Sequence, residues 1–224
     1  MKPIVLLIAF FCSTLMTAQN FSKEWKEIYQ LEKEGSYKTA LKNVNSIYEQ
    51  AHKNKNEVQV LKTFFYRQKF AKEIGTSVPD VDQIKLEIGS VSEATKLFYY
   101  LIEATELHNE MLKNPYGISR RVQTTVPLTE KSKTEWTKAD YLSQLKRLQT
   151  LTFANSSILF QSIKPYEEVI LIKDEQNGLF ENYFEFFAME WIHIYHSLES
   201  YGLTTTLEEL NISTKVLDLS DNFY

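Results

Sequence analysis

The sequence predicts an all-α protein on three observations. Apolar side chains recur at the helical i, i+3, i+4, i+7 spacing in one stretch after another, most clearly over residues 25–51. The 224 residues include only six Gly and five Pro against 14 Phe and 13 Tyr, which favours long regular elements over loops. No run longer than about five residues alternates apolar and polar side chains as a half-buried strand would.

The first 18 residues have the pattern of a secretory signal peptide. Lys2 supplies the positive charge, residues 4–15 are apolar, and cleavage is expected after Ala18, with Gln19 as the alternative. That apolar run is short for a membrane span, and no later run reaches the ~20 residues that a span needs. We therefore expect residues 19–224 to form a single helical domain, exported to the periplasm or the cell surface, with no transmembrane segment once the signal is removed.

Residues 25–51 predict two helices that fold back as an antiparallel hairpin. Gly35 tolerates the left-handed conformation that ends the first helix, and Ser36 can cap the second. With only these two residues between them, the helices must pack side by side. The small Ala40 lets the two backbones approach each other.

On Gly35, Tyr37 and Ala40 the hairpin is similar to one tetratricopeptide unit. The next ~34 residues do not repeat these positions, which is why a regular solenoid is not expected. The predicted architecture is an irregular array of antiparallel helical hairpins that begins with a tetratricopeptide-like hairpin.

The same spacing and the cap residues predict the remaining helices, at residues 57–74, 80–88, 92–113, 137–157 and 179–200, with a turn at Pro165 and a short helix at 207–210. Val58 and Phe65 belong to the expected buried stripe of the first of these. The helix at 179–200 carries a long aromatic stripe, which Phe186 and Ile192 widen beyond one face, so we expect it to be in contact on two sides.

Residues 114–135 form the least helical segment. Asn114-Pro115-Tyr116-Gly117 is expected to stop the preceding helix firmly, and the threonines, serines and Pro127 that follow show little periodicity. Twenty-odd residues is long for a connection in a compact domain, so the segment is either ordered against the surface or functional. Its basic side chains are the predicted partner-binding residues: Arg120, Arg121, Lys131 and Lys133.

Several pieces of the chain follow one another in a characteristic order: a leader ending in Ala18-Gln19, WKEIYQLEKEGSYKTALKNVNSIYEQA, VLKTFFYRQKF, ATKLFYYLIEATELHNEM, the Arg120-Arg121 loop, EWTKADYLSQLKRLQTLTFANSSIL, and YEEVILI before LFENYFEFFAMEW. In spacing and residue type this order resembles the N-terminal helical region of bacterial alpha-2-macroglobulin-like large extracellular proteins. The resemblance implies a protease-trap system in which β-sandwich domains follow the helical region and some members carry a Cys-Gly-Glu-Gln thioester. These 224 residues contain neither feature, so no residue here inherits a trapping role.

The composition and motifs argue against several classes of function. A net charge of −4 disfavours a nucleic acid as partner, which would require a basic surface. Cys12 is the only cysteine and is lost with the leader, so neither a disulfide nor a catalytic thiol is expected. No Gly-rich phosphate loop, Gly-x-Ser-x-Gly or His-Glu-x-x-His is present. We therefore expect no catalytic residue, no metal and no cofactor.

Two alternatives remain open. Glu49-x-x-His52 and Glu190-x-x-His193 have the Glu-x-x-His spacing of di-iron four-helix bundles, although Glu49 lies off the buried stripe of its helix and a chance pair is the simpler interpretation. The aromatic helix at 179–200 could instead line a pocket for a small apolar ligand, against the simpler interpretation that it is core.

The sequence as a whole favours an exported helical interaction or scaffold module of a bacterial cell-envelope protein, without catalytic activity. Its expected partner is another envelope protein or further domains of the same alpha-2-macroglobulin-like system.

Overall fold

The computed structural model describes residues 21–76, 91–170 and 180–204. The predicted signal peptide and the predicted helices at 80–88 and 207–210 lie outside the described residues. Within the described ranges every regular element is a helix, apart from one isolated bridge between Ser162 and Asn182, so the all-α class is confirmed. These residues group into two compact units, with the division falling inside one helix, between Lys62 and Thr63.

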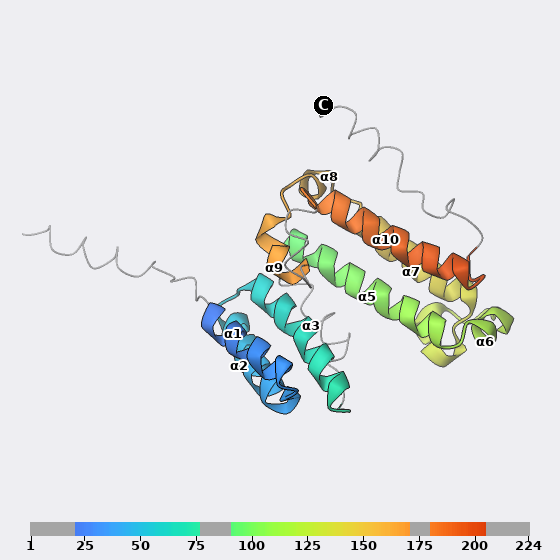
Figure 1. The fold of residues 1–224 in the computed structure, drawn as a ribbon. Coiled ribbons are helices and arrows are strands. Elements are labelled where there is room, and N and C mark those ends of the chain that lie inside the picture. Colours follow the sequence, from blue (N-terminus) through green and yellow to red (C-terminus); the bar gives the residue numbers. More distant parts are fainter. Residues whose placement is uncertain (1–20, 77–90, 171–179, 205–224) are drawn as a thin grey trace, which may run out of the picture. The chain divides into compact units, whose positions relative to one another are not determined.

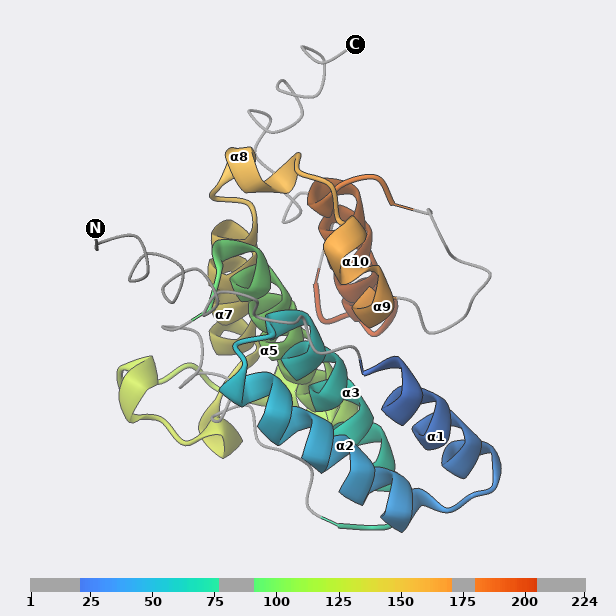
Figure 2. The same cartoon turned by 90° about the vertical axis from the view of Figure 1, so that its left-hand side faces the viewer.

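The first unit contains the predicted hairpin, α1 (Ser22–Lys33) and α2 (Tyr37–Lys53), shown in blue in Figures 1 and 2. Gly35 has a φ of +70° and ends α1 as expected. Ser36 stands at the N-cap of α2 but its side chain accepts no capping hydrogen bond, and its backbone angles, φ −81° and ψ 51°, are not the extended ones typical of an N-cap. The tetratricopeptide-like character of the hairpin stays a prediction.

The core of this unit lies between α1, α2 and the later part of α3 (Glu57–Glu73). Trp25 packs on Tyr66 with ring centroids 4.9 Å apart, and Tyr37 packs on Phe70 at 6.0 Å. The aliphatic side of the hairpin is completely buried, including Ala40. Tyr66 is deep enough in this cluster that burial raises the pKa of its hydroxyl well above the ordinary value.

Replacing Ala40 with leucine is expected to lower the free energy of unfolding by about 1–3 kcal/mol, because the larger side chain must displace helix backbones that already touch a fully buried methyl group. Urea denaturation followed by far-UV circular dichroism measures the loss. Lys38→Leu changes a solvent-facing position two residues away and serves as the control. Equal effects of the two substitutions would contradict the close helix contact.

The predicted buried stripe of α3 is partly wrong. Phe65 is exposed and Val58 is half-buried, whereas Val60, Thr63 and Phe70 are buried. The reason is that Lys55–Lys62 belongs to the second unit and the rest of the helix to the first. Since the two parts pack into different cores, no single stripe along the helix is buried.

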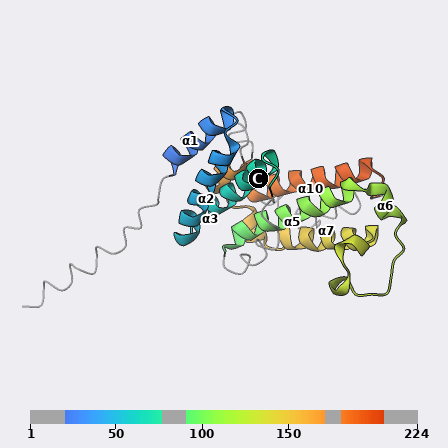
Figure 3. The ribbon, with the colours of Figure 1, turned by 90° about the horizontal axis from the view of Figure 1, so that it is seen from below.

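Three long helices form the second unit: α5 (Glu93–Lys113), α7 (Lys138–Thr152) and α10 (Tyr183–Ser200). In Figures 1 and 3, α5 runs alongside both of the others. The ion pair Arg147–Glu103, at 3.6 Å, and the hydrogen bond from the Tyr141 hydroxyl to Glu110, at 3.4 Å, together show that α7 is antiparallel to α5. Short helices α8 (Ser156–Leu159), η3 (Lys164–Tyr166) and α9 (Glu167–Ile170) connect α7 to α10.

Phe98 of α5 is the centre of an aromatic cluster. Its ring lies 4.8 Å from that of Tyr166, 5.1 Å from that of Phe187 and 5.8 Å from that of Phe186. Pairs at these separations add to the burial of apolar area that holds α10 against α5. The cluster confirms that Phe186 is buried, but Ile192 is exposed, so the expected contact through Ile192 is absent among the described residues.

A carboxylate from α3 accepts hydrogen bonds from the start of α5. Ser92 caps the helix by accepting from the Thr95 N–H, as predicted. The Glu57 carboxylate accepts from the Ser92 N–H at 2.8 Å and from the Thr95 hydroxyl at 2.5 Å. A negative charge at a helix N-terminus is stabilising, so this contact fixes the first turns of α3 in the second unit.

Candidate interaction surface

The polar loop, residues 114–135, is ordered and lies at the C-terminal end of α5 (Figures 1 and 3). The helix α5 stops at Lys113 as predicted, but a new helix, α6 (Pro115–Arg120), begins at once. Asn114 caps it by accepting from the Gly117 N–H at 3.0 Å, and proline suits its first position. The expected firm stop is therefore a break between two helices.

The second half of the loop consists of two short turns, η1 (Leu128–Glu130) and η2 (Lys133–Glu135). The second turn carries a capping box, in which Glu135 reaches back to the Ser132 N–H at 2.9 Å. Local caps at Asn114 and Ser132 therefore satisfy backbone N–H groups at the starts of α6 and η2.

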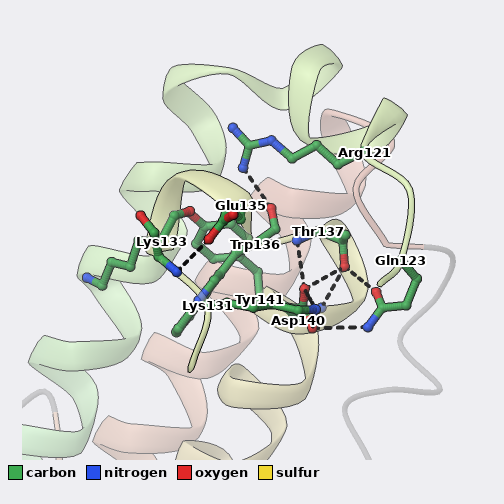
Figure 4. A network of polar contacts seen from close by, with 10 residues as sticks. Arg121, Gln123, Lys131, Lys133, Glu135, Trp136, Thr137, Asp140 and Tyr141 are labelled. Atoms are coloured by element: carbon green, nitrogen blue, oxygen red, sulfur yellow. Dashed lines mark hydrogen bonds and ion pairs between the residues drawn. The ribbon is translucent and has the colours of Figure 1, made fainter. Parts of the chain in front are cut away.

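Asp140, in the first turn of α7, is the hub that closes the loop (Figure 4). Its carboxylate accepts from the Lys131 ammonium at 2.9 Å, from the Thr137 N–H at 2.9 Å and from the Gln123 amide at 3.1 Å. The side chains of Lys131 and Asp140 are only 3% and 7% exposed. A buried pair of charges is tolerated where further hydrogen bonds are made, and the Asp140 carboxylate has three besides those from Lys131.

These contacts determine the protonation state of the Asp140 carboxyl. Burial by itself raises the pKa of its carboxyl, but the hydrogen bonds from Thr137, Lys131 and Gln123 outweigh burial and lower the pKa to about 2. The carboxylate is therefore charged over the whole range in which the protein is expected to work.

Acidification is expected to loosen the polar loop as the pH falls from about 4 to about 2. A carboxyl whose pKa is lowered on folding contributes stability above its unfolded pKa, and that stability, about 2 kcal/mol here, is lost on the way down to the folded pKa. The ¹⁵N–¹H signals of residues 121–137 report the change, and Asp140→Asn serves as the control that lacks the titrating group. An unchanged loop spectrum at pH 2.5 would contradict the assignment of Asp140 as the hub.

The structure places the four predicted partner-binding residues in four different environments. Lys131 is buried on Asp140, and Lys133 pairs with Glu110 at 3.1 Å. Arg121 donates to the Trp136 carbonyl at 2.7 Å, and Arg120 stacks over the Tyr116 ring at 3.9 Å. The two lysines thus have their charge balanced by carboxylates, while Arg121 bonds to a backbone carbonyl and Arg120 stacks on an aromatic ring. Binding of a partner by these residues stays a prediction.

Three apolar side chains of the loop face water. Val122 is 83% exposed, Tyr116 65% and Val126 45%. They follow one another along the part of the loop that precedes the Lys131–Asp140 pair. Single exposed apolar residues are common, but three on one braced loop are more typical of a contact surface.

Sequence reasoning missed Asp140, Gln123 and Glu110 as members of this network. A signal for the first was present, since Thr137-x-x-Asp140 is a capping-box spacing. No local pattern pairs Gln123 or Lys131 with a carboxylate 17 and nine residues away. Those contacts depend on how the loop folds back.

The di-metal candidates are divided between the two compact units. Glu49 and His52 belong to the first unit, and Glu190 and His193 to the second, where they form a pair at 4.0 Å. Among the described residues, no three His, Cys, Asp or Glu side chains are placed to hold a metal ion.

The apolar-ligand alternative depends on space beside the aromatic helix. Phe187 and Trp191 are completely buried, and the ring of Phe187 packs on that of Phe98. A pocket does exist in the part of the chain that the structure describes, but it lies along α2 and is lined mostly by polar side chains, Lys38, Asn45 and Glu49 among them. Neither observation provides a site for an apolar ligand.

No helix among the described residues combines the length and the apolar character needed to cross a membrane. Comparison of the chain with protein-family models, with curated proteins and with solved structures finds no match. The resemblance to the alpha-2-macroglobulin-like proteins therefore rests on the sequence pattern alone.

Proposed function

We propose that this chain is an exported helical module of a bacterial cell envelope that acts by binding another protein, without catalysis of its own. The observation that carries the proposal is that a buried ion pair and three caps order the polar loop, while Tyr116, Val122 and Val126 stay exposed on it. A surface that is ordered before binding loses little conformational entropy when a partner arrives, and exposed apolar side chains supply the area to be buried.

The two arginines support the same surface. Arg120 and Arg121 are held by an aromatic face and by a backbone carbonyl, which orient each guanidinium without neutralising it. A guanidinium has five N–H donors, and the contact of Arg121 with the Trp136 carbonyl uses only one of its terminal nitrogens. Charge and donors therefore remain for carboxylates of a partner.

The export in this proposal depends on the predicted signal peptide. Protein recovered from the envelope fraction is expected to begin at Gln19 or Asn20, because cleavage follows Ala18 or Gln19. N-terminal sequencing of that fraction decides the matter, and an intact Met1 on exported protein would contradict the export.

Site-specific photo-crosslinking tests the binding surface. A photoreactive phenylalanine analogue at Val122 is expected to crosslink one discrete envelope protein, and the same analogue at Lys42, on the exposed side of α2, is not. Both positions face solvent, so substitution at either leaves the core unchanged. Identical crosslinking patterns from the two positions, or none from Val122, would overturn the proposal.

A further inference from the structure

We infer that the segment Arg121–Thr124 is a docking edge that receives an extended, acidic segment of the partner by β-strand addition. This inference rests on the proposed function, since it names the way in which the polar loop binds. Three independent features of the segment carry it: the direction of its side chains, the state of its backbone groups and the charge around it.

The side chains alternate as they do in a strand. Arg121 has extended backbone angles, φ −66° and ψ 133°. The side chains of Arg121 and Gln123 both reach the segment 136–140, where they bond to the Trp136 carbonyl and the Asp140 carboxylate (Figure 4). Val122 and Thr124 are exposed, and so is Gln123, but the side-chain amide of Gln123 bonds inward. Successive side chains of an extended chain point to opposite faces, so the segment is pinned by one face and presents the other.

The backbone of the segment is open to a partner. Among the described residues, no backbone–backbone hydrogen bond involves an N–H or C=O group of residues 122–126. An extended segment with unpaired donors and acceptors is what strand addition uses, because the incoming chain completes the ladder of hydrogen bonds. Here the bonds of Arg121 and Gln123 brace the segment before a partner arrives.

The charge of the polar loop indicates which kind of segment would bind to this edge. The polar loop carries four basic and two acidic side chains, although the chain as a whole has a net charge of −4. Lys131 and Lys133 are paired with carboxylates, which leaves Arg120 and Arg121 beside the edge. A second copy of this chain docked edge to edge would bring these arginines against their own copies, whereas carboxylates on an incoming strand would pair with them. The occupant is therefore an acidic strand of another protein.

The probe is a synthetic eight-residue peptide of alternating Glu and Val with acetyl and amide ends. It is expected to slow hydrogen exchange at the backbone amides of Val122 and Thr124 by about tenfold or more, because these two N–H groups lie on one edge of an extended segment and become ladder donors. The same peptide with Lys in place of Glu is the control for charge, and one N-methylated at alternate backbone nitrogens is the control for the ladder. Protection by either control as strong as that by the acidic peptide would overturn the inference.

Proline variants test the edge on the protein side. Thr124→Pro removes one N–H while keeping a backbone angle that an extended chain accepts, and it is expected to weaken peptide binding about tenfold. Thr124→Ala removes the side chain, keeps the N–H, and is expected to bind as wild type does. Unchanged signals of Thr137 and Asp140 show that the loop has kept its fold. Thr125→Pro examines the opposite edge of the segment in the same way.

The outcomes separate this inference from the proposed function. A partner crosslinked at Val122 whose capture is unaffected by both proline variants would leave the protein-binding role standing and overturn strand addition. Concentration-dependent dimerisation that the proline variants abolish would assign the edge to a second copy and overturn the acidic partner. Loss of crosslinking together with loss of peptide protection in Thr124→Pro, but not in Thr124→Ala, is the result expected.

Discussion

Replacing Trp191 with alanine is expected to lower the free energy of unfolding of the second unit by about 3–5 kcal/mol, the range for removal of a large buried aromatic side chain. Trp191 is completely buried in α10 and its ring packs on that of Tyr195 at 5.9 Å. The cavity left behind adds to the lost transfer energy, because the packed helices can close it only in part. Far-UV circular dichroism in urea measures the loss without relying on the fluorescence of the residue removed.

Two further substitutions serve as controls. The Trp191 indole N–H is buried and has no partner among the described residues, so Trp191→Phe removes an unsatisfied donor along with some volume and is expected to cost much less than alanine. Ile192→Ala lies on the exposed side of the same helix and is expected to cost less than about 1 kcal/mol. Equal effects of Trp191→Ala and Ile192→Ala would show that α10 is not a core helix.

The parts of the fold that were predictable from sequence are those governed by local chemistry. Ser92, Thr137 and Gly35 mark helix ends, and the structure has a helix end at each. Caps and left-handed glycines depend on the few residues around them, which is why a single sequence reveals them. The extra helix α6 was missed because Asn114-Pro115 both ends one helix and starts the next.

The errors come from packing between distant segments. The stripe of α3 was misplaced because that helix passes from one compact unit to the other. Ile192 was expected to be in contact because it is apolar, but its side chain stays 40% exposed. Periodicity shows which side of a helix is apolar and does not show how many partners that side finds.

Only part of the candidate site was predictable from the sequence. Sequence composition identified the loop and its basic residues, and it treated Arg120, Arg121, Lys131 and Lys133 as equivalent. The structure separates them, because a buried carboxylate at Asp140 receives one lysine while the arginines meet neutral groups. Such a difference depends on the folded path of a 22-residue loop, which no spacing rule describes.

The second large effect is expected at Asp140. Asp140→Ala should lower the free energy of unfolding by about 3–5 kcal/mol, because it leaves the buried Lys131 ammonium without its counter-charge. The same change removes the acceptor for the Thr137 N–H and for the Gln123 amide, so α7 loses one half of its capping box and the loop loses its inner anchor. Urea denaturation measures the change in the free energy of unfolding. The rate of tryptic cleavage after Arg121 measures how far the loop has loosened.

The double variant Lys131→Met, Asp140→Ala distinguishes a missing counter-charge from general disruption. Because methionine keeps most of the volume of lysine without a charge, the double variant is expected to be more stable than Asp140→Ala alone. It should still be cleaved faster after Arg121 than wild type, since the anchor of Gln123 is absent from both variants. A double variant less stable than Asp140→Ala would show that the charge of Lys131 is accommodated elsewhere, and that the pair is not what orders the loop.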